Sequence, residues 1–114
     1  MTLGEKQETF SYNLAMLILF AYGRGYKVRM GEVQRTEEQA LKNAANGTGI
    51  ANSLHILKLA ADLNLFKDGK WLNQSADHAE LGAFWLSLHP DNRWGGTWAK
   101  PDGNHYSMTH GGRE

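Results

Sequence analysis

Hydrophobic positions near the start of the chain are spaced as on one face of a helix. They recur every three or four residues and comprise Phe10, Leu14, Leu17, Ile18 and Ala21. We expect this helix to be capped by Thr9 or Ser11, whose side chains can accept a hydrogen bond from a backbone N–H. Gly23 and Gly25 are expected to end it, because glycine readily takes the left-handed conformation at a helix C-terminus.

Three later segments alternate between apolar and polar residues, the period of a half-buried β-strand. They are residues 26–35, 57–65 and 105–109. Gly31 permits a kink within the first. The pair Asp68-Gly69 after the second favours a tight turn, with Trp71 and Leu72 returning antiparallel to that strand.

Two further helices are expected between and after these strands. Thr36 with Gln39 has the spacing of a capping box and opens a short helix to about Ala45. Ser75 is expected to cap a helix that Pro90 closes, because the residue before proline disfavours helix. The apolar face of this last helix consists of Leu81, Phe84, Trp85 and Leu88.

Composition narrows the class of protein. At 114 residues the chain is expected to form one domain, residues 1–114. Lys+Arg and Asp+Glu both number 12, so no basic surplus indicates a nucleic-acid partner. The chain has no cysteine, so any metal must be held by His, Asp or Glu. The apolar run over residues 14–22 is shorter than the ~20 residues that span a bilayer, and no signal peptide is evident, so we expect synthesis in the cytoplasm without membrane insertion.

The candidate chemistry begins in residues 52–66. His55 and Asp62 are zinc-ligand types, and a catalytic zinc usually takes three protein ligands plus a water. In a regular strand these two side chains would point to opposite faces. If both bind one metal, the backbone between them must be irregular. We expect the chain to turn near residues 56–58 and the regular strand to begin at about Leu59.

A third ligand and a base are available downstream. His105 opens the last strand, and Asp102 precedes it across a turn containing Pro101 and Gly103. Asp102 is placed to take a proton from an activated water, and Arg35 is a cation that can stabilise an oxyanion. The alternative is that the histidines are structural. His78 and His89 are expected to be surface or capping residues, and His110 a tail residue or a neighbour of the site.

Four pieces of sequence together resemble a known family. They are Ser53-x-His55-x-x-Lys58-x-Ala60-x-Asp62, Trp94-Gly95-Gly96, Asp102-x-x-His105 and, upstream, Arg35-Thr36-x-x-Gln39. This arrangement resembles the VanY-like zinc D-Ala-D-Ala carboxypeptidases, and most closely the bacteriophage L-alanyl-D-glutamate endopeptidases that serve as endolysins. The resemblance covers roughly residues 10–110.

The resemblance implies a small α+β domain whose antiparallel sheet carries a zinc site and is flanked by about three helices. It implies that His55, Asp62 and His105 are the zinc ligands and Asp102 the general base. Arg35 would lie near the substrate carbonyl, and Ser53 would contact the substrate. The sequence departs from the family pattern at Lys58, where glycine is common, and at Thr97, where relatives often have an acid.

The function implied is zinc-dependent cleavage of the peptidoglycan stem peptide, with the L-Ala–D-Glu bond favoured. The protein would act as a monomer of phage or prophage origin and reach the wall through a holin-type pore. Three alternatives stay open: a D,D-carboxypeptidase or dipeptidase acting on wall precursors, a non-catalytic zinc or peptide-binding module of the same superfold (as in its hedgehog branch), and a structural phage protein. A base at Asp102 favours catalysis, because a binding module has no need for one.

Overall fold

The computed structural model describes residues 1–33 and 54–112, and its central element is an antiparallel sheet. The strands are β1 (Lys27–Met30), β2 (Ala60–Lys67), β3 (Lys70–Leu72), β4 (Asn92–Trp94) and β5 (His105–Met108). Their order is β1-β2-β5-β4, and β3 pairs with the end of β2. Strand β2 therefore pairs with three strands: with β1 and β3 along its second half, and with β5 along residues 60–62.

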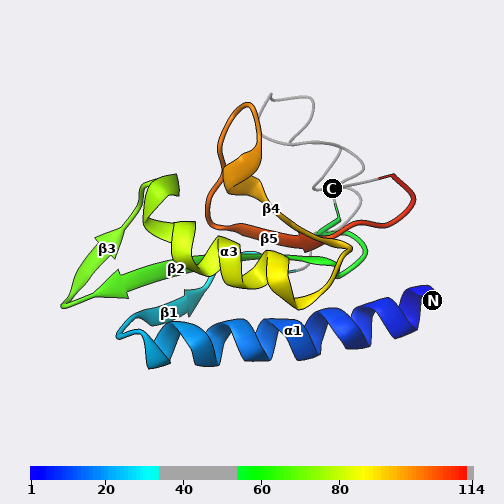
Figure 1. Cartoon of the computed structure of the whole chain (residues 1–114), viewed down its shortest axis with the longest axis horizontal. Helices are drawn as coiled ribbons and strands as arrows, with labels where there is room; N and C mark the ends of the chain where they lie inside the picture. The colour runs from blue at the N-terminus through cyan, green and yellow to red at the C-terminus, as the bar shows by residue number, and fades with distance from the viewer. Residues whose placement is uncertain (34–53, 113–114) are drawn as a thin grey trace.

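Two α-helices pack against this sheet in the described part of the chain, α1 (Leu3–Gly23) and α3 (Ala79–Leu88) (Figure 1). Phe20 of α1 stacks on Phe84 of α3, with ring centroids 4.1 Å apart. The α+β class with an antiparallel sheet is thus confirmed, with two α-helices in residues 1–33 and 54–112. The helix expected over residues 36–45 lies outside the described residues. No helix among those described is long and apolar enough to cross a membrane.

Helix α1 begins earlier than expected, and neither Thr9 nor Ser11 caps it. Thr2 is the N-cap: its side chain accepts from the N–H of Glu5, and the Glu5 carboxylate accepts from the N–H of Thr2. This capping box stabilises a polar first turn that has no apolar periodicity. The end of the helix is as expected, since Gly25 has φ +90° and directly follows the C-cap.

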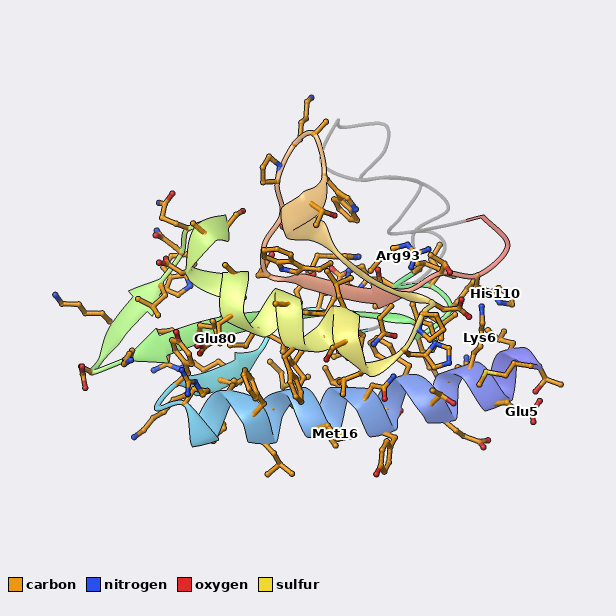
Figure 2. The ribbon with its side chains drawn as sticks, viewed as in Figure 1. Glu5, Lys6, Met16, Glu80, Arg93 and His110 are labelled. Carbon is orange, nitrogen blue, oxygen red and sulfur yellow. The ribbon has the colours of Figure 1, made fainter. Side chains whose placement is uncertain are left out.

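The polar first turns of α1 tie distant segments together. The ammonium of Lys6 donates to the carbonyl of Thr109 and lies 3.8 Å from Asp91. Figure 2 shows Lys6 pointing from α1 toward the C-terminal segment beside His110. The side-chain amide of Gln7 donates to the carbonyl of Leu57 at 2.8 Å. The start of α1 thus holds the segment that leads into β2.

The core lies on one face of β2. The odd-numbered side chains of β2 (Ala61, Leu63 and Leu65) are fully buried with Tyr106, Trp85 and Leu17. The even-numbered side chains project from the opposite face, because side chains alternate along a strand. At the far end of β2, Asp68 and Gly69 form the expected tight turn, which pairs Lys67 with Lys70.

The helix expected from Ser75 is built in two pieces. A 3₁₀ turn, η1 (Ser75–His78), precedes α3. Gln74, and not Ser75, is the N-cap residue, and its N–H donates to the Asp77 carboxylate at 3.0 Å. The hydroxyl of Ser75 instead accepts from the N–H of Gly103, also at 3.0 Å, so it fixes the loop before β5.

The histidines beside α3 have different roles. His89 is the C-cap residue of α3, as expected, and its Nδ1 accepts from the N–H of Asp91. His78 is the N-cap residue of α3, so the expected capping position is confirmed, but it is not a surface residue: it is 2% exposed, and its Nδ1 lies 2.6 Å from the hydroxyl of Tyr106. Burial lowers the pKa of His78 to about 4, so this imidazole is neutral at physiological pH.

Candidate metal centre

A compact turn before β2 presents His55. The N–H groups of Leu57 and Leu59 both donate to the carbonyl of Leu54, and the N–H of Lys58 faces the carbonyl of His55 at 3.3 Å. Strand β2 then starts at Ala60. The backbone between His55 and Asp62 is therefore irregular in the expected place, and this irregularity removes the conflict between their faces.

Lys58 occupies a left-handed backbone conformation within this turn, with φ +58°. Left-handed backbone is unfavourable for residues with a Cβ and nearly cost-free for glycine. This conformation explains why a glycine suits the position in the sequence pattern. The departure at Lys58 leaves the turn intact and adds local strain.

The sheet register brings the remaining two side chains together. Asp62 on β2 is directly opposite His105 on β5, so both project from the same face. Oδ1 of Asp62 lies 3.4 Å from Nε2 of His55 and 3.4 Å from Nδ1 of His105. The His105 ring also packs beside Trp98, at 4.8 Å between ring centroids.

The three side chains lie close enough together to hold a metal ion, and two of their three separations have tetrahedral spacing. One ligand atom from each of His55, Asp62 and His105 lies within 4.8 Å of the others. Two ligands at the usual zinc distances of about 2.0–2.1 Å stand roughly 3.3–3.4 Å apart in a tetrahedral site. The observed 3.4 Å separations match that spacing. Oδ1 of Asp62 is moreover buried without a hydrogen-bond partner, as expected of an atom shaped for another ligand.

The charge state of Asp62 suits this role. Burial alone would raise its pKa, but its interactions with His105 and then His55 outweigh burial and lower the pKa to about 2. Asp62 is therefore a carboxylate at any physiological pH, the form in which it can bind a cation.

The other nitrogen of His55 faces two oxygen atoms. Its Nδ1 lies 3.4 Å from the carbonyl of Val33 and 3.8 Å from the carboxylate of Glu32. A proton held on Nδ1 by these acceptors leaves the lone pair of Nε2 directed at Asp62. Metal-binding histidines commonly have such an outer partner, which fixes the tautomer and ring orientation.

Glu32 was missed by sequence reasoning. The N–H of Gly31 donates to the carbonyl of Asp62, and the N–H of Asp62 donates to the carbonyl of Glu32. Two residues after β1 thus face one residue of β2, which is the arrangement of a β-bulge. A Cβ on Gly31 would lie 2.9 Å from the Asp62 carbonyl oxygen. The one signal in the sequence was Gly31, where a kink was expected, because a kink there redirects the side chain of the next residue, Glu32.

Asp102 lies beside the three side chains on the loop before β5. Its N–H donates to the carbonyl of Gly95 at 2.9 Å, and its own carbonyl accepts from the N–H of His105 at 3.1 Å. A Cβ on Gly95 would lie 2.1 Å from the Asp102 carbonyl oxygen, so glycine is required for this close approach. Partial burial, and then the negative charge of Asp62, raise the pKa of the Asp102 carboxyl.

The structure does not bring every candidate to this centre. Arg35 and Ser53 lie outside the described residues. Within residues 1–33 and 54–112, the group able to hold a metal contains neither His110 nor His78. The triad expected from sequence is thus brought together, with Asp102 as its neighbour.

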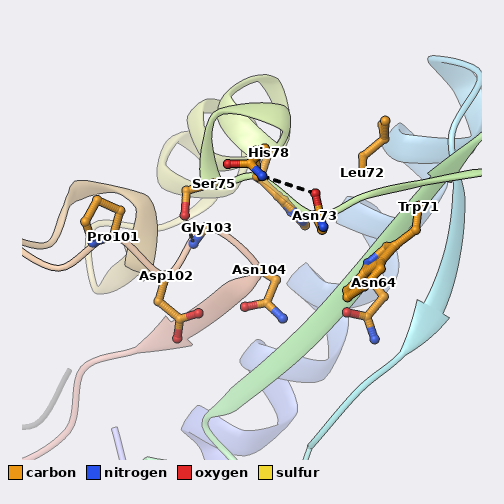
Figure 3. A pocket seen from close by; sticks show the side chains of 11 residues that line it. Asn64, Trp71, Leu72, Asn73, Ser75, His78, Pro101, Asp102, Gly103 and Asn104 are labelled. Atoms are coloured by element: carbon orange, nitrogen blue, oxygen red, sulfur yellow. Dashed lines mark hydrogen bonds between the residues drawn. The ribbon is translucent and has the colours of Figure 1, made fainter.

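A polar pocket includes Asp102 in its lining (Figure 3). It has a volume of about 230 Å³ and is lined in part by Asp102, Asn104 and Asn64. Asn64 and Asn104 each lie close in sequence to a member of the triad, Asp62 and His105 respectively. The pocket and the metal centre therefore share β2 and the start of β5.

Comparison with known proteins identifies the fold. The sequence matches no protein-family model and no curated protein sequence. Among solved structures, the chain is similar to the Serratia marcescens L-Ala D-Glu endopeptidase ChiX. The TM-score is 0.70 at 18% identity, over 93% of this chain and 85% of that one. The protein therefore shares the fold of this endopeptidase. Membership of the VanY-like family stays a prediction.

Proposed function

We propose that this protein is a zinc-dependent peptidase that cleaves the stem peptide of bacterial peptidoglycan, at the bond between L-Ala and D-Glu. The convergence of His55, Asp62 and His105, with Oδ1 of Asp62 3.4 Å from a ring nitrogen of each histidine, carries the proposal. The fold shared with an L-Ala D-Glu endopeptidase supports the choice of substrate. Asp102 beside the triad supports a catalytic role over simple binding.

Each side chain has a distinct part in this proposal. His55, Asp62 and His105 hold the zinc ion, which when bound lowers the pKa of a water molecule and polarises the scissile carbonyl. Asp102 accepts the proton of the attacking water and delivers it to the leaving amine. Its raised pKa favours this exchange, because the carboxyl is then easier to protonate and can act in turn as base and acid.

Two further residues complete the proposal. Arg35 stabilises negative charge on the substrate carbonyl oxygen, and Ser53 contacts the substrate. Both assignments come from the sequence resemblance. Origin from a phage and release through a holin-type pore also stay predictions from sequence.

The test is digestion of purified sacculi followed by mass spectrometry of the released fragments, with and without a chelator. We expect fragments with a new D-Glu N-terminus, formed only when metal is present. Release of D-Ala alone would instead support the D,D-carboxypeptidase alternative.

Asp102→Asn separates catalysis from metal binding. We expect this variant to retain zinc and to lose cleavage by at least about 100-fold, the usual contribution of a positioned base. If Asp102→Asn digested sacculi at the parent rate, Asp102 would not be the base. If the parent bound zinc and released no fragment, the protein would be a binding module.

A further inference from the structure

The pocket beside the metal centre has a second end, away from Asp102, that is lined by an aromatic ring. Trp71 of β3 lines that end, and its side chain is 58% exposed. In Figure 3, Asn104 lies between Asp102 and Asn64, and Trp71 lies over Asn64. The pocket thus runs from a carboxylate at the metal centre to an exposed aromatic ring at the sheet edge.

The sheet register makes the pocket continuous with the triad. Asp62 and Asn64 are two residues apart on β2, so they project from one face. Phe66, on the same face, is directly opposite Trp71 on β3. A substrate bound at the metal centre and extending along this face of β2 therefore reaches Asn64 and then Trp71.

The lining is polar but almost uncharged. It includes the amide side chains of Asn64, Asn73, Gln74 and Asn104, and the lining residues in the described part of the chain include no lysine or arginine. His78 also lines it, and burial lowers the pKa of this imidazole to about 4. Asp102 supplies a negative charge. A carboxylate-bearing ligand would find no cation among the described residues that line the pocket, whereas a neutral ligand with many hydroxyl and amide groups would find donors and acceptors.

We propose that this pocket binds the sugar to which the stem peptide is attached, N-acetylmuramic acid, with Trp71 packed against the sugar ring. Asn64, Asn73 and Asn104 hydrogen-bond to its hydroxyl and acetamido groups. The proposal rests on the proposed function, because in peptidoglycan L-Ala is joined through its amine to the lactyl group of this sugar. That linkage consumes the sugar's carboxyl group, so the sugar is uncharged, as the lining requires.

Binding is measured first, by calorimetric titration of the full zinc-loaded chain with N-acetylmuramoyl-L-alanine. This probe carries the sugar and lacks the scissile bond. We expect Trp71→Ala to weaken its binding by about tenfold, the scale of one lost aromatic contact, and Trp71→Phe to retain most of it. Tyr12→Ala is the matched control, because Tyr12 is a 68% exposed aromatic residue on α1 that does not line the pocket. Parent protein that did not bind the probe, or Trp71→Ala that bound it as the parent does, would overturn the proposal.

Cleavage is measured second, on two soluble substrates that carry the same peptide with either N-acetylmuramoyl or acetyl at its N-terminus. We expect kcat/KM to be higher for the sugar-bearing substrate, and Trp71→Ala to remove most of that advantage through KM. Tyr12→Ala, outside the pocket, should leave kcat/KM for both substrates unchanged. Equal kcat/KM for both substrates would overturn the sugar pocket and leave the peptidase assignment standing. Binding of the probe through Trp71 without cleavage of either substrate would support the pocket and contradict the peptidase assignment.

Discussion

Strand β2 begins after one tight turn and ends in another, and both turns contain a non-glycine residue in the left-handed conformation. Lys58 precedes the strand with φ +58°, and Asp68 follows it with φ +52°. The first turn presents His55 to the candidate metal centre, whereas the second joins β2 to β3.

The two turns reach this conformation for different reasons. Asp68 is followed by Gly69, and an Asp-Gly pair favours a two-residue hairpin turn. Lysine has no such preference, so Lys58 must be held by its surroundings. The buried side chains of Leu54 and His55 and the hydrogen bond from Gln7 to Leu57 supply that constraint. Strain of this kind is commonly retained where it positions a functional group.

The largest predicted difference between the turns concerns metal binding. His55→Ala removes a proposed ligand and should abolish both bound zinc and cleavage of sacculi. The loss of zinc affinity should exceed roughly 100-fold, the upper range for removing a residue that hydrogen-bonds to a metal ligand. Zinc content by atomic spectroscopy and fragment release report the two effects. Asp68→Ala, in the other turn, should change neither, and if it did the two ends of β2 would not be functionally distinct.

A smaller effect is expected from the carboxylate behind His55. Glu32→Gln weakens the acceptor that faces Nδ1, so zinc affinity should fall by about tenfold or more. Competition with a chromophoric chelator measures this affinity, and Asp68→Asn is the matched control. Unchanged affinity in Glu32→Gln would mean that the Glu32 carboxylate does not orient the imidazole.

Sequence patterns predicted the parts of the fold that depend on neighbouring residues. The Asp68-Gly69 turn, the end of α1 at Gly25 and the closure of α3 before Pro90 all follow from local backbone chemistry. The start of α1 was missed because its first turn carries a capping box without apolar periodicity.

The site was predicted in part for the same reason. Spacing indicated that His55 and Asp62 need an irregular backbone between them, and the turn at Lys58 supplies it. The approach of Glu32 to His55, however, depends on a bulge between two strands far apart in sequence. The burial of His78 depends on Tyr106 of another strand. Neither contact leaves a periodic signal in the sequence.

Acid should destabilise the protein through Asp62, near the start of β2, and not through Asp68, after its end. The pKa of Asp62 is lowered from its ordinary 3.8 to about 2, so its stabilising contribution is complete above about pH 4 and is lost as pH falls through 2. In metal-free protein this loss should be roughly 2 kcal/mol of unfolding free energy. Denaturant titrations across pH 2–4 of the parent and of Asp62→Asn measure the difference. Asp68→Asn is the control, and parallel curves for the parent and Asp62→Asn would contradict this assignment.

The smallest effects test the strain itself. Lys58→Gly should relieve about 1–2 kcal/mol of left-handed strain in the folded state. Glycine also raises the conformational entropy of the unfolded chain, which costs about 0.5–1 kcal/mol of stability. The free energy of unfolding should therefore rise by a net of about 0.5–1 kcal/mol. Asp68→Gly should change stability by less, because aspartate tolerates this conformation better than lysine. Urea unfolding of the metal-free proteins measures both changes, and zinc affinity should be unchanged in each. Equal gains in the two variants would show that the strain is not concentrated at the metal centre. A loss of zinc affinity in Lys58→Gly would show instead that the stiffness of Lys58, and not only the path of the backbone, keeps His55 directed at Asp62.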